Sequence, residues 1–278
     1  MKRRLVGISA PIVLTMFLAA GCSPSYQPLT ESQISAALED FELPSALVKL
    51  SDRSDAEFQE AYSLIEGYTP RFPSVSSTCQ AVGEFPRVAQ YAQGGSSWKQ
   101  YMPAELRGFD AIGGAHYGLS NAAGAEDFAT VGLDIAVLAF ASSDQAKDFA
   151  SLVRDNLEAC FDFPKTSMPV TGVELDVLSF ASTLIQSDLE LDGGGFSFEV
   201  EEDTHLELSK IAGILDDSIV TDNKIIEVRQ YGPNLVVLVA TSSSKADAAF
   251  GISAFTIGEQ FPVIQEELGP LLRDASND

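Results

Sequence analysis

The sequence predicts an α+β fold in which a central antiparallel β-sheet is packed with helices. Several strand-like segments follow one another in the second half of the chain, which is typical of such a sheet. The last of them, residues 225–241, is interrupted at 231–234 by a turn between two apolar runs, which indicates a β-hairpin. Apolar residues also recur at helical spacing near both ends and in the middle of the chain. Nothing in this order has the pattern of a βαβ dinucleotide-binding unit.

Helices are predicted in the first part of the chain. Thr30 is followed three residues later by Gln33, which is the pattern of a capping box, and the apolar spacing predicts a helix from there to Phe41. The same spacing predicts a second short helix over residues 55–66 and a further helix over 84–91.

The centre of the chain reads as a strand, a short turn and a helix. Residues 128–140 are rich in β-branched and apolar side chains, which predicts a buried strand. Ser142 is the predicted cap of a helix whose apolar residues recur at helical spacing as far as Leu157. Cys160 follows directly, so a disulfide at this position would hold the end of the helix.

Strands and one helix make up the remainder. Residues 173–185 and 196–201 are strand-like and precede the hairpin at 225–241. A terminal helix is predicted over 257–272, with Pro270 weakening its last turn. All these elements are assigned to one domain, residues 31–278.

Composition excludes two classes of function. The chain has 278 residues, of which 45% are hydrophobic and 21% charged, so it is long and apolar enough for a packed core. Its 17 Lys and Arg against 40 Asp and Glu give a net charge of −23, which excludes a nucleic-acid partner because phosphate binding needs clustered cations. Two His and one candidate pair of mature Cys, for which a disulfide is predicted below, leave too few ligands for an ordinary zinc site built from four Cys and His.

The first residues have the features of a secretion signal. Lys2, Arg3 and Arg4 precede an apolar stretch over residues 5–20, which is too short for a membrane-spanning helix. Residues 1–21 are therefore predicted to be a signal peptide.

The end of that signal, Leu-Ala-Ala-Gly-Cys at residues 18–22, resembles the bacterial lipobox. The resemblance implies that Cys22 is acylated, with palmitate among its chains, and that residues 22–30 form a lipidated tether. The protein is then held on the extracytoplasmic face of the cell membrane by its lipid, since two or three acyl chains anchor a protein stably. The alternative is an ordinary signal peptide followed by a free thiol.

With Cys22 lipidated, two cysteines remain. Outside the cytoplasm the simplest prediction for Cys79 and Cys160 is a disulfide, which would stabilise the fold by about 4 kcal/mol by closing a long loop. A catalytic cysteine is the weaker alternative, because neither thiol has a histidine near it in the sequence.

Two stretches, residues 133–163 and 225–243, resemble the PknH-like extracellular sensor domain that is shared by many actinobacterial lipoproteins. In that family a strand leads through a small-residue turn into a helix followed by a Cys, and a late hairpin carries alternating valines. The resemblance implies an α+β domain with a central antiparallel sheet and a ligand-binding cleft. The kinase after which this family is named has two disulfides in its sensor domain, whereas this chain can make one.

An acidic segment matches the spacing of a Ca²⁺ loop. Asp188, Glu190 and Asp192 alternate before a glycine run, and Glu199 stands at the twelfth position of the loop. Carboxylates in this arrangement can wrap a hard cation. The alternative is a β-hairpin with an acidic solvent face, because apolar residues alternate with polar ones on both sides of the glycines.

Other motifs favour structural roles. Ser96 and Lys99 match the S-x-x-K nucleophile motif of penicillin-binding proteins, but Ser96 lies in a Gly/Ser loop, which favours chance. His116 and His205 are interpreted as structural histidines rather than catalytic bases. Four aromatic residues could form either core or an apolar pocket: Trp98, Tyr101, Phe109 and Tyr117.

The sequence therefore predicts a membrane-anchored extracytoplasmic lipoprotein with a sensor-like, non-catalytic domain. Its expected partner is a small molecule or a component of the cell envelope, and no cofactor is expected unless the acidic hairpin takes Ca²⁺. The alternatives are a lipid or glycolipid carrier and a cell-envelope hydrolase.

Overall fold

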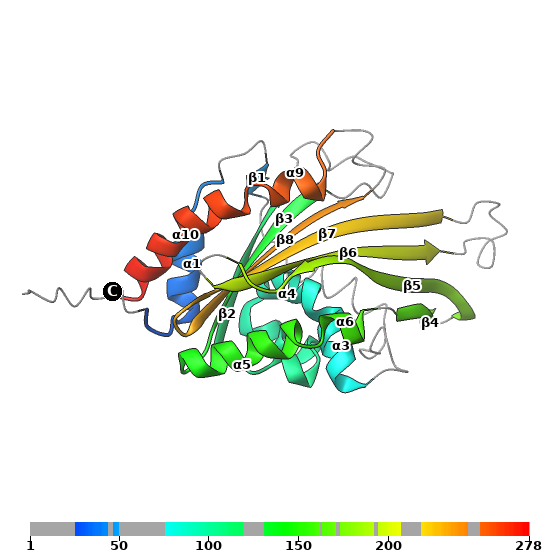
Figure 1. Ribbon diagram of the computed structural model, residues 1–278, viewed down its shortest axis with the longest axis horizontal. Helices are drawn as coiled ribbons and strands as arrows, with labels where there is room; N and C mark the ends of the chain where they lie inside the picture. The colour runs from blue at the N-terminus through cyan, green and yellow to red at the C-terminus, as the bar shows by residue number, and fades with distance from the viewer. Residues whose placement is uncertain are drawn as a thin grey trace, which may run out of the picture.

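A computed structural model describes residues 26–43, 47–49, 76–118, 131–161, 163–170, 173–191, 194–206, 218–243 and 251–277. In this part of the chain, one eight-stranded sheet has the strand order β1-β2-β3-β8-β7-β6-β5-β4, and every neighbouring pair is antiparallel. Helices cover both faces of the sheet (Figure 1). The predicted α+β class with a central antiparallel sheet is confirmed.

The strands are β1 (Val48–Lys49), β2 (Ala111–Gly118), β3 (Val131–Ala139), β4 (Phe163–Val170), β5 (Val173–Asp188), β6 (Gly195–Leu206), β7 (Ser218–Tyr231) and β8 (Asn234–Ser243). The helices are α1 (Glu31–Glu39), α3 (Ser77–Glu84), α4 (Val88–Ala92), α5 (Ser143–Arg154), α6 (Leu157–Cys160), α9 (Ala254–Gly258) and α10 (Phe261–Ala275). Short 3₁₀ helices lie at η1 (Phe85–Arg87), η2 (Gly95–Tyr101) and η3 (Ala104–Leu106).

Alternate residues of the central strands point to two separate cores. Ala136 and Leu138 of β3 pack with side chains of α3, α4, α5 and α6 on one face. Leu133 and Ile135 of the same strand pack with α1, α9 and α10 on the other face. This alternation is the period of two that a buried strand imposes, and it makes the domain three layers thick.

Local signals placed several elements correctly. The capping box predicted at Thr30 and Gln33 is present and begins α1. Ser142 accepts a hydrogen bond from the Gln145 N–H and begins α5. The hairpin predicted over 225–241 is the β7–β8 pair, whose two-residue turn contains Gly232 at a φ of 59°.

Other predictions were wrong in detail. The single terminal helix predicted over 257–272 is two helices, α9 and α10, and Pro262 in the first turn of α10 explains the break, since proline lacks an N–H but is tolerated at a helix start. β2 was not predicted, because Gly113 and Gly114 weaken its strand pattern. These glycines are required, since a Cβ at Gly113 would lie 2.6 Å from Ile34 and one at Gly114 2.8 Å from Ala92. The helix predicted over 55–66 lies outside the described residues.

Candidate functional site

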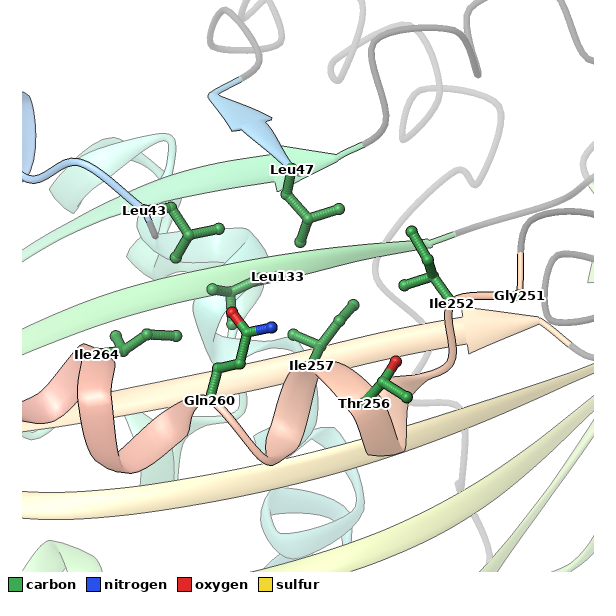
Figure 2. A pocket seen from close by; sticks show the side chains of 9 residues that line it. All are labelled: Leu43, Leu47, Leu133, Gly251, Ile252, Thr256, Ile257, Gln260 and Ile264. Atoms are coloured by element: carbon green, nitrogen blue, oxygen red, sulfur yellow. The ribbon is translucent and has the colours of Figure 1, made fainter. Parts of the chain in front are cut away.

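An apolar pocket lies on the face of the sheet that α9 and α10 cover. Its volume is about 200 Å³. Figure 2 shows the lining side chains, which come from the segment before β1, from β3, and from the start of the α9–α10 region. They are Leu43, Leu47, Leu133, Gly251, Ile252, Thr256, Ile257, Gln260 and Ile264.

Hydrogen bonds at the start of α9 position one wall of this pocket. Ser253 forms a capping box with Thr256, and the Ala254 N–H donates to the buried Ser242 Oγ of β8 at 2.8 Å. Below, Leu133 is fully buried and forms part of the floor on β3. The pocket wall is therefore tied to the sheet, which makes the cavity largely pre-formed.

The chemistry of the lining is apolar with one polar edge. Gln260 lies between α9 and α10, and Figure 2 shows its amide directed toward the middle of the pocket. Thr256 is the other polar side chain among the described residues of the lining, and none of these residues is titratable. The volume is below the roughly 300–1,000 Å³ of sites that enclose drug-sized ligands. The pocket therefore suits a small, largely apolar molecule that accepts or donates a hydrogen bond at Gln260.

The opposite face carries a buried ionic cluster that we define by Glu84, Arg87, Glu202 and Lys224. Glu202 Oε2 accepts hydrogen bonds from Arg87 Nη2 and Lys224 Nζ, both at 2.7 Å. Arg87 Nη1 also lies 3.4 Å from Glu84 Oε2. All four residues are at most 6% exposed, so their charges interact with little screening by water.

The pKa values of the two carboxyl groups in the ionic cluster are shifted in opposite directions. Burial, reinforced by the neighbouring Glu202 carboxylate, raises the pKa of Glu84 to about 8. Burial also opposes ionisation of Glu202, but Arg87 and Lys224 outweigh it and lower the pKa of Glu202 to about 2. At neutral pH Glu84 is thus mainly protonated and Glu202 is ionised. Glu84 Oε1 has no hydrogen-bond partner among the described residues.

His116 and Asp134 form a second polar contact on the same face as the ionic cluster. His116 Nδ1 lies 2.7 Å from Asp134 Oδ1, which also accepts a hydrogen bond from Gln93 Nε2 at 2.8 Å. This pair joins β2, β3 and the end of α4, so it gives His116 the structural contact that the sequence analysis favoured. The side chain of His205 lies outside the described part of the chain.

The structure confirms the predicted disulfide between Cys79 and Cys160. The two sulfurs are 2.02 Å apart, and the bridge joins residues 81 positions apart in the sequence. It connects α3 to α6, on the same side of the sheet as the ionic cluster. Cys22 lies outside the described residues, and its lipidation stays a prediction.

The acidic segment is confirmed as a β-hairpin between β5 and β6. Glu199 pairs with Gln186, whose Nε2 donates to Glu199 Oε2 at 2.8 Å, and Asp188 pairs with Ser197. The Asp188 carboxylate accepts from the Glu190 N–H, while Asp192 is outside the described residues. Within the part of the chain that the structure describes, no three His, Cys, Asp or Glu side chains gather as a metal site. The Ca²⁺ site stays a prediction.

The other candidate motifs have structural contacts. Lys99 Nζ donates to the Phe109 carbonyl and lies 4.5 Å from the centroid of the Phe109 ring, while the Ser96 N–H donates to Glu31. Of the four aromatic residues, Trp98, Phe109 and Tyr117 are buried. Tyr117 belongs to the core opposite the other two, so the core interpretation of this group is confirmed.

Sequence reasoning missed both the pocket and the ionic cluster. A signal for the cluster was present, because Glu202 continues the alternation of Phe196, Phe198 and Val200 along the buried face of β6. Lys224 likewise continues the alternation of β7. The pocket had no comparable signal, since aliphatic residues that line a cavity look like core residues in the sequence.

No helix among the described residues has both the length and the apolar character to cross a bilayer. The chain matches no protein-family model and no curated protein. Among solved structures it is similar to the extracellular domain of PknH from Mycobacterium tuberculosis, with 12% sequence identity, 90% of this chain and 100% of the other covered, and a TM-score of 0.39. This similarity is too low to assign a function.

Proposed function

We propose that the protein is an extracytoplasmic lipoprotein whose domain binds a small, largely apolar molecule in the pocket between α9, α10 and the segment before β1, without turning it over. The observation that carries the proposal is the pocket itself, which is lined by aliphatic side chains around the Gln260 amide. From the sequence patterns at residues 133–163 and 225–243, we also propose that it belongs with the actinobacterial lipoproteins that carry a PknH-like sensor domain.

Two features support a binding role over a catalytic one. Catalysis of acyl or glycosyl transfer needs titratable groups near the reacting atoms, and the described lining of this pocket holds none. The half-buried His116 contact and the ionic cluster lie on the opposite face of the sheet. A bound molecule would therefore be held and released unchanged.

Two features support a location outside the cytoplasm. The signal segment ends in a lipobox-like sequence at Cys22. The Cys79–Cys160 disulfide is of the kind that persists in oxidising compartments.

A pocket-filling variant tests the binding proposal. N-phenyl-1-naphthylamine, a neutral apolar probe whose fluorescence rises in apolar surroundings, is titrated into the purified oxidised protein. Ile252→Trp should raise the Kd at least about tenfold, which corresponds to about 1.4 kcal/mol, because the indole occupies the cavity. Val263→Trp is the matched control, since Val263 is 46% exposed on α10 and lies outside the described lining. Equal probe affinity in both variants would exclude this pocket as the site.

A lipid carrier is the alternative that the same protein can test. A whole acyl lipid needs a larger cavity than 200 Å³, so we expect no lipid to co-purify with the Cys22→Ser variant. A stoichiometric lipid in native mass spectra of that variant would favour the carrier instead.

A further inference from the structure

The segment that follows the lipidation site is fixed to one end of the sheet. The Tyr26 ring packs against Tyr231 with centroids 5.4 Å apart. Asn234, which is fully buried, donates to the Gln27 carbonyl at 2.9 Å and accepts from the Leu29 N–H at 3.2 Å. The chain is thus bound to the β7–β8 turn from Tyr26 onward, before α1 begins.

Other segments meet at this same end, which we call the turn end. Gln230 Nε2 donates to the Ser143 carbonyl at the start of α5, and Gln33 Nε2 donates to the Ala275 carbonyl at the end of α10, both at 2.8 Å. Figure 1 shows the end of α10 and the blue N-terminal segment together at one side of the molecule. The turn end therefore comprises residues 26–30, the β7–β8 turn, the start of α5 and the end of α10.

Covalent geometry limits the distance between this end and the lipid. Four peptide bonds separate Cys22 from Tyr26, and four residues span at most about 14 Å. The ten residues of β8 extend for about 30 Å from the turn end. The part of the predicted tether that precedes Tyr26 is shorter than the strands. An acylated Cys22 in the bilayer therefore keeps the turn end close to the membrane, and the opposite end of the sheet cannot take its place.

We propose that the turn end faces the membrane and that the pocket lies on the half of the domain remote from it. This inference rests on the lipid anchor of the proposed function. Leu133 in the pocket floor lies six residues along β3 from Ala139, which pairs with Asn234 at the turn end. Six residues of strand place the pocket about 20 Å farther from the bilayer. The ligand then arrives from the extracytoplasmic space or from another envelope component, and not from the underlying bilayer.

Two labelling positions test the orientation. Asp144→Cys places a thiol on the exposed first turn of α5 at the turn end. Thr183→Cys places a thiol on an exposed position of β5. Cross-strand pairs connect this position through Glu201 and Asn223 to Ser242, which lies near the end of β8 remote from the turn end. In the full-length acylated protein Cys22 is blocked and Cys79 and Cys160 are bridged, so a bimane label reacts at the new thiol alone.

The labelled proteins are bound to phosphatidylcholine vesicles that contain a lipid with a nitroxide on its headgroup. We expect the nitroxide to quench bimane at position 144 severalfold more than at position 183. Equal quenching, or stronger quenching at 183, would overturn the orientation. Inserting a Gly/Ser linker of about twenty residues between Ser25 and Tyr26, with an average reach of about 25 Å, should abolish the difference. A difference of unchanged size in that variant would also overturn the argument from tether length.

Separate measurements test the lipid anchor and the orientation of the domain. Mass spectrometry of the N-terminal peptide reports acylation of Cys22, and Cys22→Ser should abolish vesicle binding. An unacylated wild-type chain would overturn the anchor and the orientation together. An acylated, vesicle-bound chain without the expected quenching pattern would overturn the orientation alone.

Discussion

On the face covered by α3, α4, α5 and α6, the apolar core adjoins buried ion pairs. A disulfide joins two of these helices. On the face covered by α1, α9 and α10, the core is apolar up to a cavity of about 200 Å³. Both faces belong to the same strands, since Leu133 and Asp134 are neighbours on β3 and point to opposite sides.

The difference separates two tasks within one sheet. Buried ion pairs require exact partners, because a charge without its partner is costly in a low-dielectric interior. Apolar packing tolerates a ligand-sized gap more easily, since the side chains around the pocket are mainly aliphatic. We interpret the charged face as the rigid support and the apolar face as the one that accepts a ligand.

The largest expected effect is on the charged face. Glu202→Gln removes the carboxylate that Arg87 and Lys224 share, and it should lower the free energy of unfolding by about 5 kcal/mol. Urea denaturation followed by circular dichroism measures the change. Glu201→Gln is the control, because this neighbour points to the other side of β6 and should cost less than about 0.5 kcal/mol. Equal losses would show that the ionic cluster adds no stability to this face.

The disulfide supplies the next effect. The double variant Cys79→Ala/Cys160→Ala should lose about 4 kcal/mol, because the unfolded chain regains the freedom of a long loop. Cys22→Ser, which leaves the bridge intact, should unfold at the urea midpoint of the oxidised parent. A double variant with that same midpoint would contradict a stabilising role for the bridge.

On the apolar face the expected loss is smaller. Leu268 is fully buried in α10, and Leu268→Ala should cost about 3 kcal/mol through lost burial and a new cavity. Val263→Ala on the exposed side of the same helix should cost less than about 0.5 kcal/mol. Similar losses in the two variants would mean that α10 contributes little packing energy to this face.

The pH dependence of stability should come from the charged face. The pKa of Glu84 rises from its ordinary value of 4.5 to about 8 on folding, chiefly through burial. The folded state therefore holds a proton that the unfolded chain releases, so this contribution is complete below pH 4.5 and is lost as the pH rises through 8. The slope is at most about 1.4 kcal/mol per pH unit. The pKa of Glu202 is lowered to about 2, so its contribution is lost in a separate window, as the pH falls from 4.5 through 2.

Glu84→Gln tests this slope. Urea denaturation at intervals between pH 5 and pH 8 should show a flatter decline in the variant than in the parent, whereas Leu268→Ala should keep the parent's slope. An unchanged slope in Glu84→Gln would assign the pH dependence to other groups.

Features within a few residues of one another were predictable from the sequence. The capping box at Thr30, the cap at Ser142 and the β7–β8 turn are formed by neighbouring residues, and their side chains select the local backbone directly. The disulfide was predicted from the number of cysteines together with the secretion signal predicted over residues 1–21. The strand that contains Gly113 and Gly114 was not predicted. Its glycines are explained by the close approach of α1 and α4, which come from elsewhere in the chain.

Local sequence patterns were thus sufficient to predict the fold class, the starts of α1 and α5, the late hairpin and the pairing of Cys79 with Cys160. Which charges are buried together, and where the apolar surface leaves a cavity, became known only from the packing of the folded chain. These features join residues that are far apart in the sequence. Arg87 and Glu202 are 115 residues apart, and the pocket combines the segment around Leu43 with β3 and α9. Burial depends on how such distant segments pack, and no local preference of the backbone encodes it.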